Sequence, residues 1–564
     1  MKQFIFLLFW LVTLSLQAQP AYVFPVPGSN YHKPEVQIIL KDQRGFDQNE
    51  IEVQIVAEKS ENHSCRFLFP DKTTIIIAPD KPFYRSEEVS VWISGSFYEK
   101  REPFELSYSF YTEKAKINME TSFSTTKDYP PDFPSTTVTV NDNPAEGKIF
   151  FYNLSALASS NDRFISIIEN DGTPVFYQQE SNRGLGFTLQ KNGYMSYWNN
   201  GNFLVMDSSY TVIDSFACGN GYYTDWHEFQ YLDNGHALVF SYDSQPVDMS
   251  SVVAGGNPDA IVEGLVLQEI DEDKNVIFQW RSWDHYNITD ATNIDFTSDL
   301  VSYVHGNAIE EDTDGNILLS ARRLDEITKI DRMTGEVIWR LGGVNNQFQF
   351  LQDTVGFSRQ HDIRRIENGN ITLYDNGNNR DVPVSSAKEY ELDESNMTAK
   401  LVWSFTHPDS IFAETMGSVQ RLSNGNTFIN WGWLENSEQP AFTEVSYDSI
   451  IVYELKFNTF FHFVYRARRF LWNNPYDTLG VESALADQSV KVYPNPCKSN
   501  LNVCSSVAVD LCEIYGVDGR LVQRRTLLSQ KIFVVRMQNL NPGIYLLKLY
   551  CKSGEIINRK IIRN

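Results

Sequence analysis

Cysteine is scarce in this chain of 564 residues, and its spacing excludes two kinds of site. No C-x-x-C pair occurs, so the sequence has neither the pattern of a zinc site nor the framework of a disulfide scaffold. A local disulfide in the C-terminal stretch is left open. The six cysteines are Cys65, Cys218, Cys497, Cys504, Cys512 and Cys551.

Positive charge is also in short supply. The chain has 48 Lys and Arg against 72 Asp and Glu, which gives a net charge of −24. Such a chain would repel a polyanion, so we expect no nucleic-acid partner. No GxxxxGK[ST] or GxGxxG loop opens a helix, which disfavours a nucleotide-dependent enzyme. We expect no cofactor and no metal.

Long apolar runs are absent except at the N-terminus. The stretch "MKQFIFLLFWLVTLSLQAQP" has one early lysine, a short apolar run and small residues near Ala18, which is typical of a secretory signal. We assign residues 1–18 to a signal peptide. No other segment has the ~20 apolar residues of a spanning helix. We therefore expect a protein exported through the periplasm, secreted or at the cell surface, without a stable membrane span.

Aromatic residues and turn signals are abundant and favour an all-β fold. Short strand-like runs in residues 19–126 predict an N-terminal β-sandwich. The proline-rich residues 127–137 are expected to be a linker. Residues 138–472 form a repeat region, 473–487 a second linker, and 488–564 a small C-terminal β-sandwich.

The repeat region alternates two kinds of hairpin. One is a strand, an NG-type turn and a strand, as in "HEFQYLDNGHALVF"; the other has an acidic turn and an apolar strand, as in "TKIDRMTGEVIWRLGG". Two such hairpins make a four-stranded unit that cannot bury both faces alone, so radial stacking into a β-propeller of six blades is predicted. The widest gap between turn glycines, from Gly235 to Gly315, indicates an insertion, which we place at Ser244 to Gly264.

Three histidines occupy the same place in the repeat, just before its first strand: His227, His305 and His361. Equivalent positions of successive blades point toward a common axis, so their side chains are expected to converge. Structural hydrogen bonding remains the alternative for each of them. Asp362, next to His361, either orients an imidazole or points to the opposite face.

The last 75 or so residues resemble the C-terminal sorting domain of type IX secretion cargo, in the order "YPNP", "IYGVDGRLV" and "LNPGIYLLKL". The resemblance implies the type IX secretion machinery as a protein partner. It implies no role for this domain in chemistry.

The propeller region resembles the bacterial arylsulfate sulfotransferases. The resemblance is carried by "HGN", "LLSARR", "KIDRMTGEVIWRLGG" and "HDIRRIENGNITLYDNG", in that order. It implies nucleotide-independent transfer of a sulfuryl group from an aryl sulfate to a phenol, by a ping-pong mechanism through a sulfohistidine. These phenols and aryl sulfates are the implied small-molecule partners, and a homodimer is left open.

The family's motifs are then matched residue by residue. The resemblance implies that His361 is the nucleophile. It implies sulfuryl binding by His305 and Arg322, and it matches His227 to an earlier family histidine. Asn307 and Arg380 are expected to assist in binding. Two other functions stay open: a non-catalytic surface propeller that binds glycans, peptides or phenols, and a hydrolase that passes the sulfuryl group to water.

Overall fold

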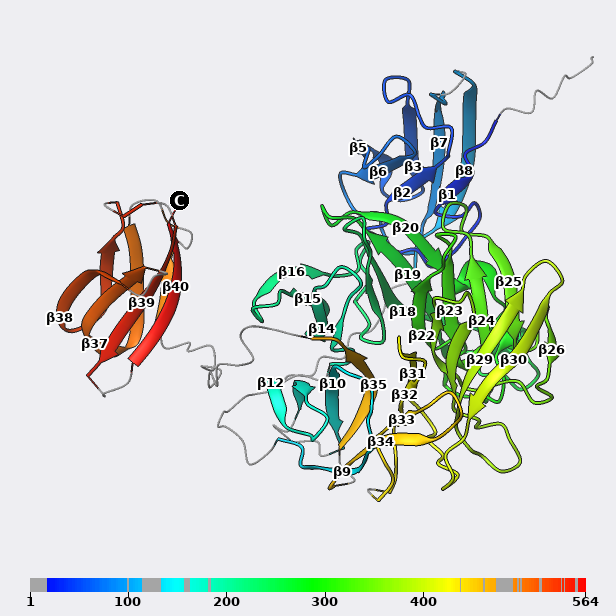
Figure 1. Ribbon diagram of the computed structural model, residues 1–564. Coiled ribbons are helices and arrows are strands. Elements are labelled where there is room, and N and C mark those ends of the chain that lie inside the picture. The colour runs from blue at the N-terminus through cyan, green and yellow to red at the C-terminus, as the bar shows by residue number, and fades with distance from the viewer. Residues whose placement is uncertain are drawn as a thin grey trace, which may run out of the picture. The chain divides into compact units, whose positions relative to one another are not determined.

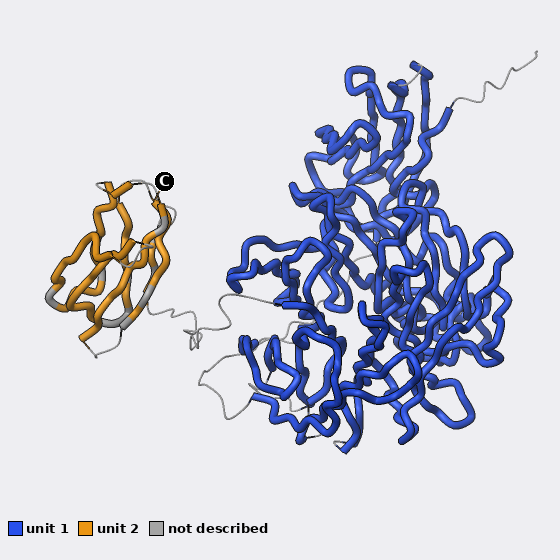
Figure 2. The backbone as a smooth tube through the Cα atoms, in the orientation of Figure 1, with its two compact units in different colours: residues 1–474 blue, residues 475–564 orange. Residues whose placement is uncertain are grey.

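The computed structural model describes residues 18–98, 101–113, 133–156, 163–180, 184–436, 438–459, 462–472, 490–493, 497, 500–516, 520–538, 540–541, 543–552 and 556–563. Nearly all of the expected signal peptide, most of the first linker and the whole second linker lie outside these residues. The chain divides into two compact units, residues 1–474 and 475–564 (Figure 2).

The all-β prediction is confirmed. Among the described residues the only helical elements are α1 (Ser282–His285) and three 3-10 turns, Met249–Ser251, Ile288–Asp290 and Arg322–Leu324. No helix in the described part of the chain is long and apolar enough to cross a membrane.

Two antiparallel sheets at the N-terminal end enclose one core, in which Ile38, Ile77, Val91 and Phe110 are fully buried (Figure 1). The burial of β7 (Glu88–Ser96) alternates along the strand, as expected when one face of a sheet packs and the other meets solvent. In sheet order, the strands are β1 (Tyr22–Phe24), β2 (Ile38–Lys41), β6 (Thr74–Pro79) and β5 (Cys65–Leu68), then β4 (Glu61–His63), β3 (Glu52–Ala57), β7 (Glu88–Ser96) and β8 (Pro103–Tyr111).

Six further sheets make up the rest of this unit, each built on four antiparallel strands. The first three contain β35 (His462–Phe470), β10 (Lys148–Ser155), β11 (Phe164–Ile168) and β12 (Pro174–Gln179); β13 (Thr188–Leu189), β14 (Met195–Asn199), β15 (Asn202–Met206) and β16 (Val212–Phe216); and β17 (Phe229–Tyr231), β18 (Ala237–Val247), β19 (Ala260–Ile270) and β20 (Val276–Arg281), with β21 (Leu300–Ser302) beside β19.

The other three continue the order along the chain. They contain β22 (Gly306–Glu311), β23 (Ile317–Ala321), β24 (Glu326–Ile330) and β25 (Val337–Gly342); β27 (His361–Arg365), β28 (Ile371–Asp375), β29 (Ser386–Asp393) and β30 (Thr398–Phe405), with β26 (Gln349–Leu351) at the edge; and β31 (Ser418–Arg421), β32 (Thr427–Asn430), β33 (Phe442–Val445) and β34 (Ile451–Phe457), with β9 (Thr136–Asn141) at the edge.

The innermost strands of these sheets close a ring. β17 contacts β22, β22 contacts β27, β27 contacts β31, β31 contacts β35, and β35 contacts β13. Gln190, the residue after β13, joins that strand to β17. Its side chain donates to the Phe229 carbonyl and accepts from the Tyr231 amide. The ring is that of a β-propeller. It is closed because β35, the last strand of this unit, pairs with β10 in the first of the six sheets.

The turns follow the predicted chemistry. Gly193, Gly235, Gly315, Gly369 and Gly425 all have φ between 81° and 89°, which favours glycine in the tight turn of each inner hairpin. Thr136 and Thr137, which we expected in the linker, already belong to β9.

The widest glycine gap contains extra chain in two places. Residues 244–264 lie largely in an extended hairpin, because β18 and β19 stay paired as far as Val247 and Ala260. A second excursion follows β20: it holds α1 and β21 and returns to the ring at β22. The sequence indicated only the first of these.

The second unit is a five-stranded antiparallel sheet with its own core around Leu501, Ile514, Leu547 and Ile561. Its strands are β36 (Val490–Tyr493), β37 (Asn500–Gly516), β38 (Leu521–Arg536), β39 (Gly543–Cys551) and β40 (Ile556–Arg563).

Candidate active site

Three histidines line one cavity of about 440 Å³ near the middle of the ring. His227 precedes β17, His305 precedes β22, and His361 is the first residue of β27. The ring centroids of His227 and His305 are 5.1 Å apart. The Tyr465 ring lies 5.4 Å from His227 and 6.0 Å from His361. The structure therefore brings together the side chains that the repeat aligned.

His361 is buried and held in one tautomer. Asn376 donates its amide to the carbonyls of Ala413 and Met416, each at 2.9 Å, so its oxygen faces the imidazole. His361 Nδ1 lies 2.7 Å from that oxygen and donates its proton to it. Nε2 therefore carries the lone pair, and it accepts only a long bond of 3.3 Å from the Met416 amide.

The surroundings of His361 keep it neutral. Burial, and after it the positive charge of Arg322, lower the pKa of its imidazole to about 3. The hydrogen bond to Asn376 acts in the opposite direction but is the weaker influence. A neutral imidazole whose Nε2 lone pair is held only by the long bond from the Met416 amide has the properties of a nucleophile.

His227 is held differently. Its Nδ1 lies 2.5 Å from Asp225 Oδ1, and the same oxygen accepts the backbone amide of His227 at 2.8 Å. A carboxylate at this position fixes the orientation of the ring. Among the described residues, His227 is thus the imidazole of the cavity whose ring contacts a carboxylate.

His305 has no carboxylate partner among its described contacts. Burial and the neighbouring His227 and Arg322 hold the pKa of His305 well below its usual range, so it is neutral. Its backbone lies in the left-handed region, with φ of 51°, beside a bulge at Gly306–Ala308. Asp362 has φ of 61° beside a similar bulge after His361. Bulges and unusual backbone conformations of this kind re-aim side chains and are common beside active sites.

Arg322 follows β23 and lies next to the histidines without lining their cavity. Its Nη2 donates to the Glu414 carbonyl at 2.9 Å, and the next residues, Thr415 and Met416, form part of the cavity wall. Burial and the neighbouring arginines lower the pKa of Arg322 to about 10, so it remains a cation at neutral pH.

Asn307 and Arg380 lie outside the cavity. Asn307 is fully buried, and its amide donates to the Gln360 carbonyl at 2.7 Å, which ties β22 to the residue before His361. Arg380 forms an ion pair with Asp375 and bonds the Val384 carbonyl. Both side chains brace the loops behind the site and do not face the imidazoles.

The remaining cavity wall is largely apolar, and no motif of the sequence indicated it. Trp433 stacks on Phe463 with ring centroids 4.5 Å apart. These residues come from segments far apart in the chain, so no local motif unites them. Most of the wall is formed by Leu154, Leu185, Trp226, Met416, Trp433, Phe463 and Tyr465.

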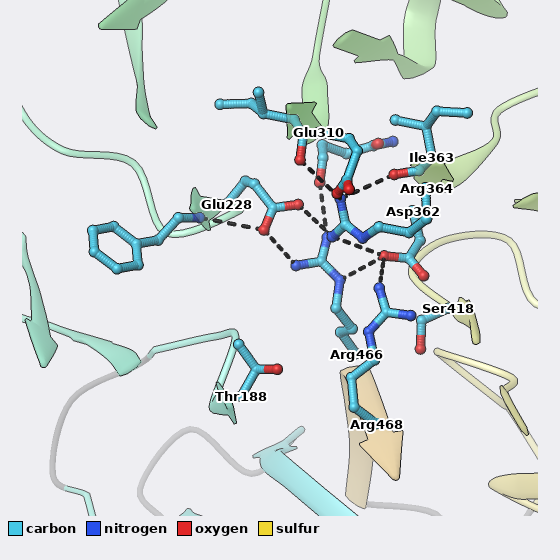
Figure 3. Close-up of polar contacts among 12 residues, drawn as sticks. Thr188, Glu228, Glu310, Asp362, Ile363, Arg364, Ser418, Arg466 and Arg468 are labelled. Carbon is cyan, nitrogen blue, oxygen red and sulfur yellow. Dashed lines mark hydrogen bonds and ion pairs between the residues drawn. The ribbon is translucent and has the colours of Figure 1, made fainter. Parts of the chain in front are cut away.

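A buried ionic cluster lies on the other side of the same strands (Figure 3). Asp362 Oδ1 meets Arg466 Nε at 2.8 Å, Arg468 Nη2 at 2.6 Å and Arg364 Nη2 at 3.0 Å. Glu228 meets Arg364 Nη2 at 2.6 Å and Arg466 Nη1 at 2.9 Å. Asp362 therefore points away from the imidazoles and joins β27 to β35.

Each of these acids directly follows a histidine of the cavity. Glu228 follows His227 and Asp362 follows His361, while Arg466 follows Tyr465. Consecutive residues of an extended chain face opposite sides. Arg466 and Arg364 bind both acids, so the cluster fixes the two histidine-bearing strands relative to each other.

The described part of the chain contains no group of three or more His, Cys, Asp or Glu side chains arranged to hold a metal ion.

Comparison with known proteins gives two family matches. The arylsulfotransferase (ASST) family matches residues 172–458, and the secretion system C-terminal sorting domain matches residues 491–564. The second match indicates an exported protein, secreted or held at the cell surface. No curated protein matches the chain.

Solved structures with similar folds are distant. A protein of unknown function from Bacteroides caccae is 14% identical, with a TM-score of 0.38, over 57% of this chain and 98% of its own. An inactive variant of virginiamycin B lyase from Staphylococcus aureus, solved with quinupristin, is 9% identical, with a TM-score of 0.32, over 66% of this chain and 96% of its own.

The ionic cluster leads to a stability prediction. Asp362→Asn leaves Arg468 buried without its carboxylate and Arg466 with Glu228 alone, so we expect the free energy of unfolding to fall by about 3 kcal/mol. Glu391→Gln is the matched control: it breaks the exposed 3.4 Å pair with Lys400 and should cost less than about 1 kcal/mol.

Both values are measured by chemical denaturation followed through tryptophan fluorescence. All 11 tryptophans lie at or before Trp472, so this signal reports the first unit alone. Equal losses in the two variants would contradict a special role for the cluster.

Proposed function

The chain belongs to the arylsulfotransferase family, and on this premise we propose that it transfers a sulfuryl group from an aryl sulfate to a phenol through a sulfohistidine at His361. The observation that carries this proposal is the neutral imidazole of His361, which lines a largely apolar cavity next to Arg322 and whose Nε2 accepts only one long hydrogen bond.

In the first half-reaction the sulfuryl group passes from the aryl sulfate to His361. Nε2 of His361 attacks the sulfur, and the bond from sulfur to the aryl oxygen breaks. The leaving phenolate takes a proton from Nε2 of His227, whose ring is oriented by Asp225. Arg322 and the neutral His305 stand beside the sulfuryl oxygens and stabilise their negative charge.

The second half-reaction reverses these roles. A phenol enters the cavity, its oxygen attacks the sulfur, and the bond from sulfur to Nε2 breaks. Neutral His227 accepts the phenol proton, which returns His227 to its charged form and His361 to its free form. The apolar wall excludes water from the sulfohistidine, which favours a phenol over hydrolysis.

The nucleophile is tested with p-nitrophenyl sulfate. We expect His361→Asn to lose about 1,000-fold or more in nitrophenolate release, because no covalent intermediate forms. His63→Asn, in the N-terminal sandwich, is the matched control and should keep wild-type rates.

Intact-mass measurement supplies the second readout. Wild-type protein treated with donor alone should gain one SO₃ group and lose it when phenol is added. Nitrophenolate release that does not depend on phenol would indicate a hydrolase. Absence of release and of protein sulfation in the folded wild type would instead support a binding propeller.

The role of His227 is tested by the leaving group. We expect His227→Gln to slow transfer from phenyl sulfate about 100-fold, because the basic phenolate then departs without a proton. Transfer from p-nitrophenyl sulfate should fall much less, since nitrophenolate leaves readily. An equal loss of kcat/KM for both donors would show that His227 is not the acid.

The pH dependence follows from the lowered pKa of His361. Its imidazole stays neutral down to a pH near its pKa of about 3, so kcat/KM should show no loss of nucleophile near pH 6.5. The unfolded chain takes up this proton first, so the stability from burying neutral His361 is present above about pH 6.5 and is lost as pH falls.

Activity and thermal unfolding are therefore measured together from pH 4 to pH 9. An inflection near pH 6.5 that persists in His227→Gln, while the fold is intact, would contradict a neutral, low-pKa His361.

A further inference from the structure

A second cavity of about 440 Å³ lies beside the histidine cavity, and three arginines line it. Arg322 and Arg323 come from the 3-10 turn after β23, and Arg359 comes from the segment before β27. Arg359 is buried, and the other two are half-buried.

These three guanidinium groups form no ion pair with a described carboxylate. Arg359 Nη2 donates to the carbonyls of Thr292 and Asn293, and Arg322 Nη2 donates to that of Glu414. The Nε atoms of Arg322 and Arg323 are buried with no partner among the described residues. The acidic side chains that line this cavity, Asp295 and Glu414, are both exposed.

The arginines of the buried ionic cluster differ from these three. Arg364, Arg466 and Arg468, which are equally central, all bind carboxylates. Burying like charges together is costly unless an anion compensates them. Planar guanidinium groups with free N–H donors match the oxygens of carboxylates and sulfates.

The two cavities share a wall. The carbonyl of Glu414 accepts bonds from Arg322 Nη2 at 2.9 Å and from Asn378 Nδ2 at 3.0 Å. Thr415 and Met416, which come next in the chain, line the histidine cavity. Arg322 also lowers the pKa of both His361 and His305, so its charge acts in both spaces.

We propose that the cavity lined by Arg322, Arg323 and Arg359 is a second anion subsite, which takes an acidic group, a carboxylate or a further sulfate, carried by the aryl substrate in addition to the group transferred. This subsite rests on the proposed sulfuryl transfer. Its outer wall includes Asn293, Ile294, Leu300 and Val301, which belong to the excursion between β20 and β22.

The test compares acidic phenols with neutral analogues of the same shape. Acceptors are 4-hydroxybenzoate, 4-hydroxyphenylacetate and 3-(4-hydroxyphenyl)propanoate, each beside its methyl ester, with p-nitrophenyl sulfate as donor. We expect wild-type kcat/KM to favour at least one acid over its ester about tenfold. Arg323→Gln should reduce this preference at least fivefold while activity with plain phenol stays within twofold.

Two variants control for charge and folding. Arg323→Lys should recover part of the preference, because it keeps the cation but loses the planar fork. Arg66→Gln removes the same charge from the exposed surface of the N-terminal sandwich and should leave the preference unchanged. No preference in the wild type for any acid, or a preference that survives Arg323→Gln, overturns the subsite.

A binding measurement separates this proposal from the function it rests on. Calorimetry with each of the three acids uses His361→Asn protein, with and without Arg323→Gln. Binding that needs Arg323 supports the subsite even if no aryl sulfate is turned over. Binding that is equal in the two proteins overturns the subsite even if transfer is confirmed.

Discussion

The arrangement of the site depends on one buried ionic cluster, in which Arg466 bridges Glu228 and Asp362. Removing these charges from water costs several kcal/mol for each ion, and the cost is offset only if every group finds a partner. Arg364 and Arg468 supply the additional contacts, so the cluster fixes β27 and β35 and the residue before β17 at set distances. The ring can hold imidazoles at its centre because the neighbouring residues are locked in this way.

Consecutive residues of an extended chain face opposite sides, so residues next to each other in the sequence serve either the cavity or the ionic cluster. His227, His361 and Tyr465 face the cavity, while the next residue in each case faces the cluster. The charges of the cluster are thereby kept on one side, and burial on the other side keeps His361 and His305 neutral. His227 differs from these two in its partner, because Asp225 Oδ1 lies 2.5 Å from its Nδ1.

Much of the fold and of the histidine site could be predicted from the repeat in the sequence. The glycine turns identified the hairpins, and the common offset of His227, His305 and His361 indicated that they converge. The sequence did not distinguish the roles of Asn307 and Arg380, because a motif shows adjacency along the chain and not direction. Asn307 lies at a bulge and points between strands, and Asp375 draws Arg380 away. The apolar wall was equally hidden, since Leu154, Trp433 and Phe463 meet only when the ring closes.

The two cavities differ in how strongly the propeller ring fixes the positions of their walls. The histidine cavity is built from inner strands whose positions are fixed by the ring and by the ionic cluster. The arginine cavity takes one wall from the excursion between β20 and β22, which pairs with the propeller sheets only where β21 lies beside β19. Changes there would alter which acidic groups fit without moving His361 or Asn376. Arg322 lines the second cavity and lies next to the first, so any anion bound beside it would also reduce the positive charge that lowers the pKa of His361. Occupancy of the second cavity and the basicity of the proposed nucleophile are therefore linked through one guanidinium group.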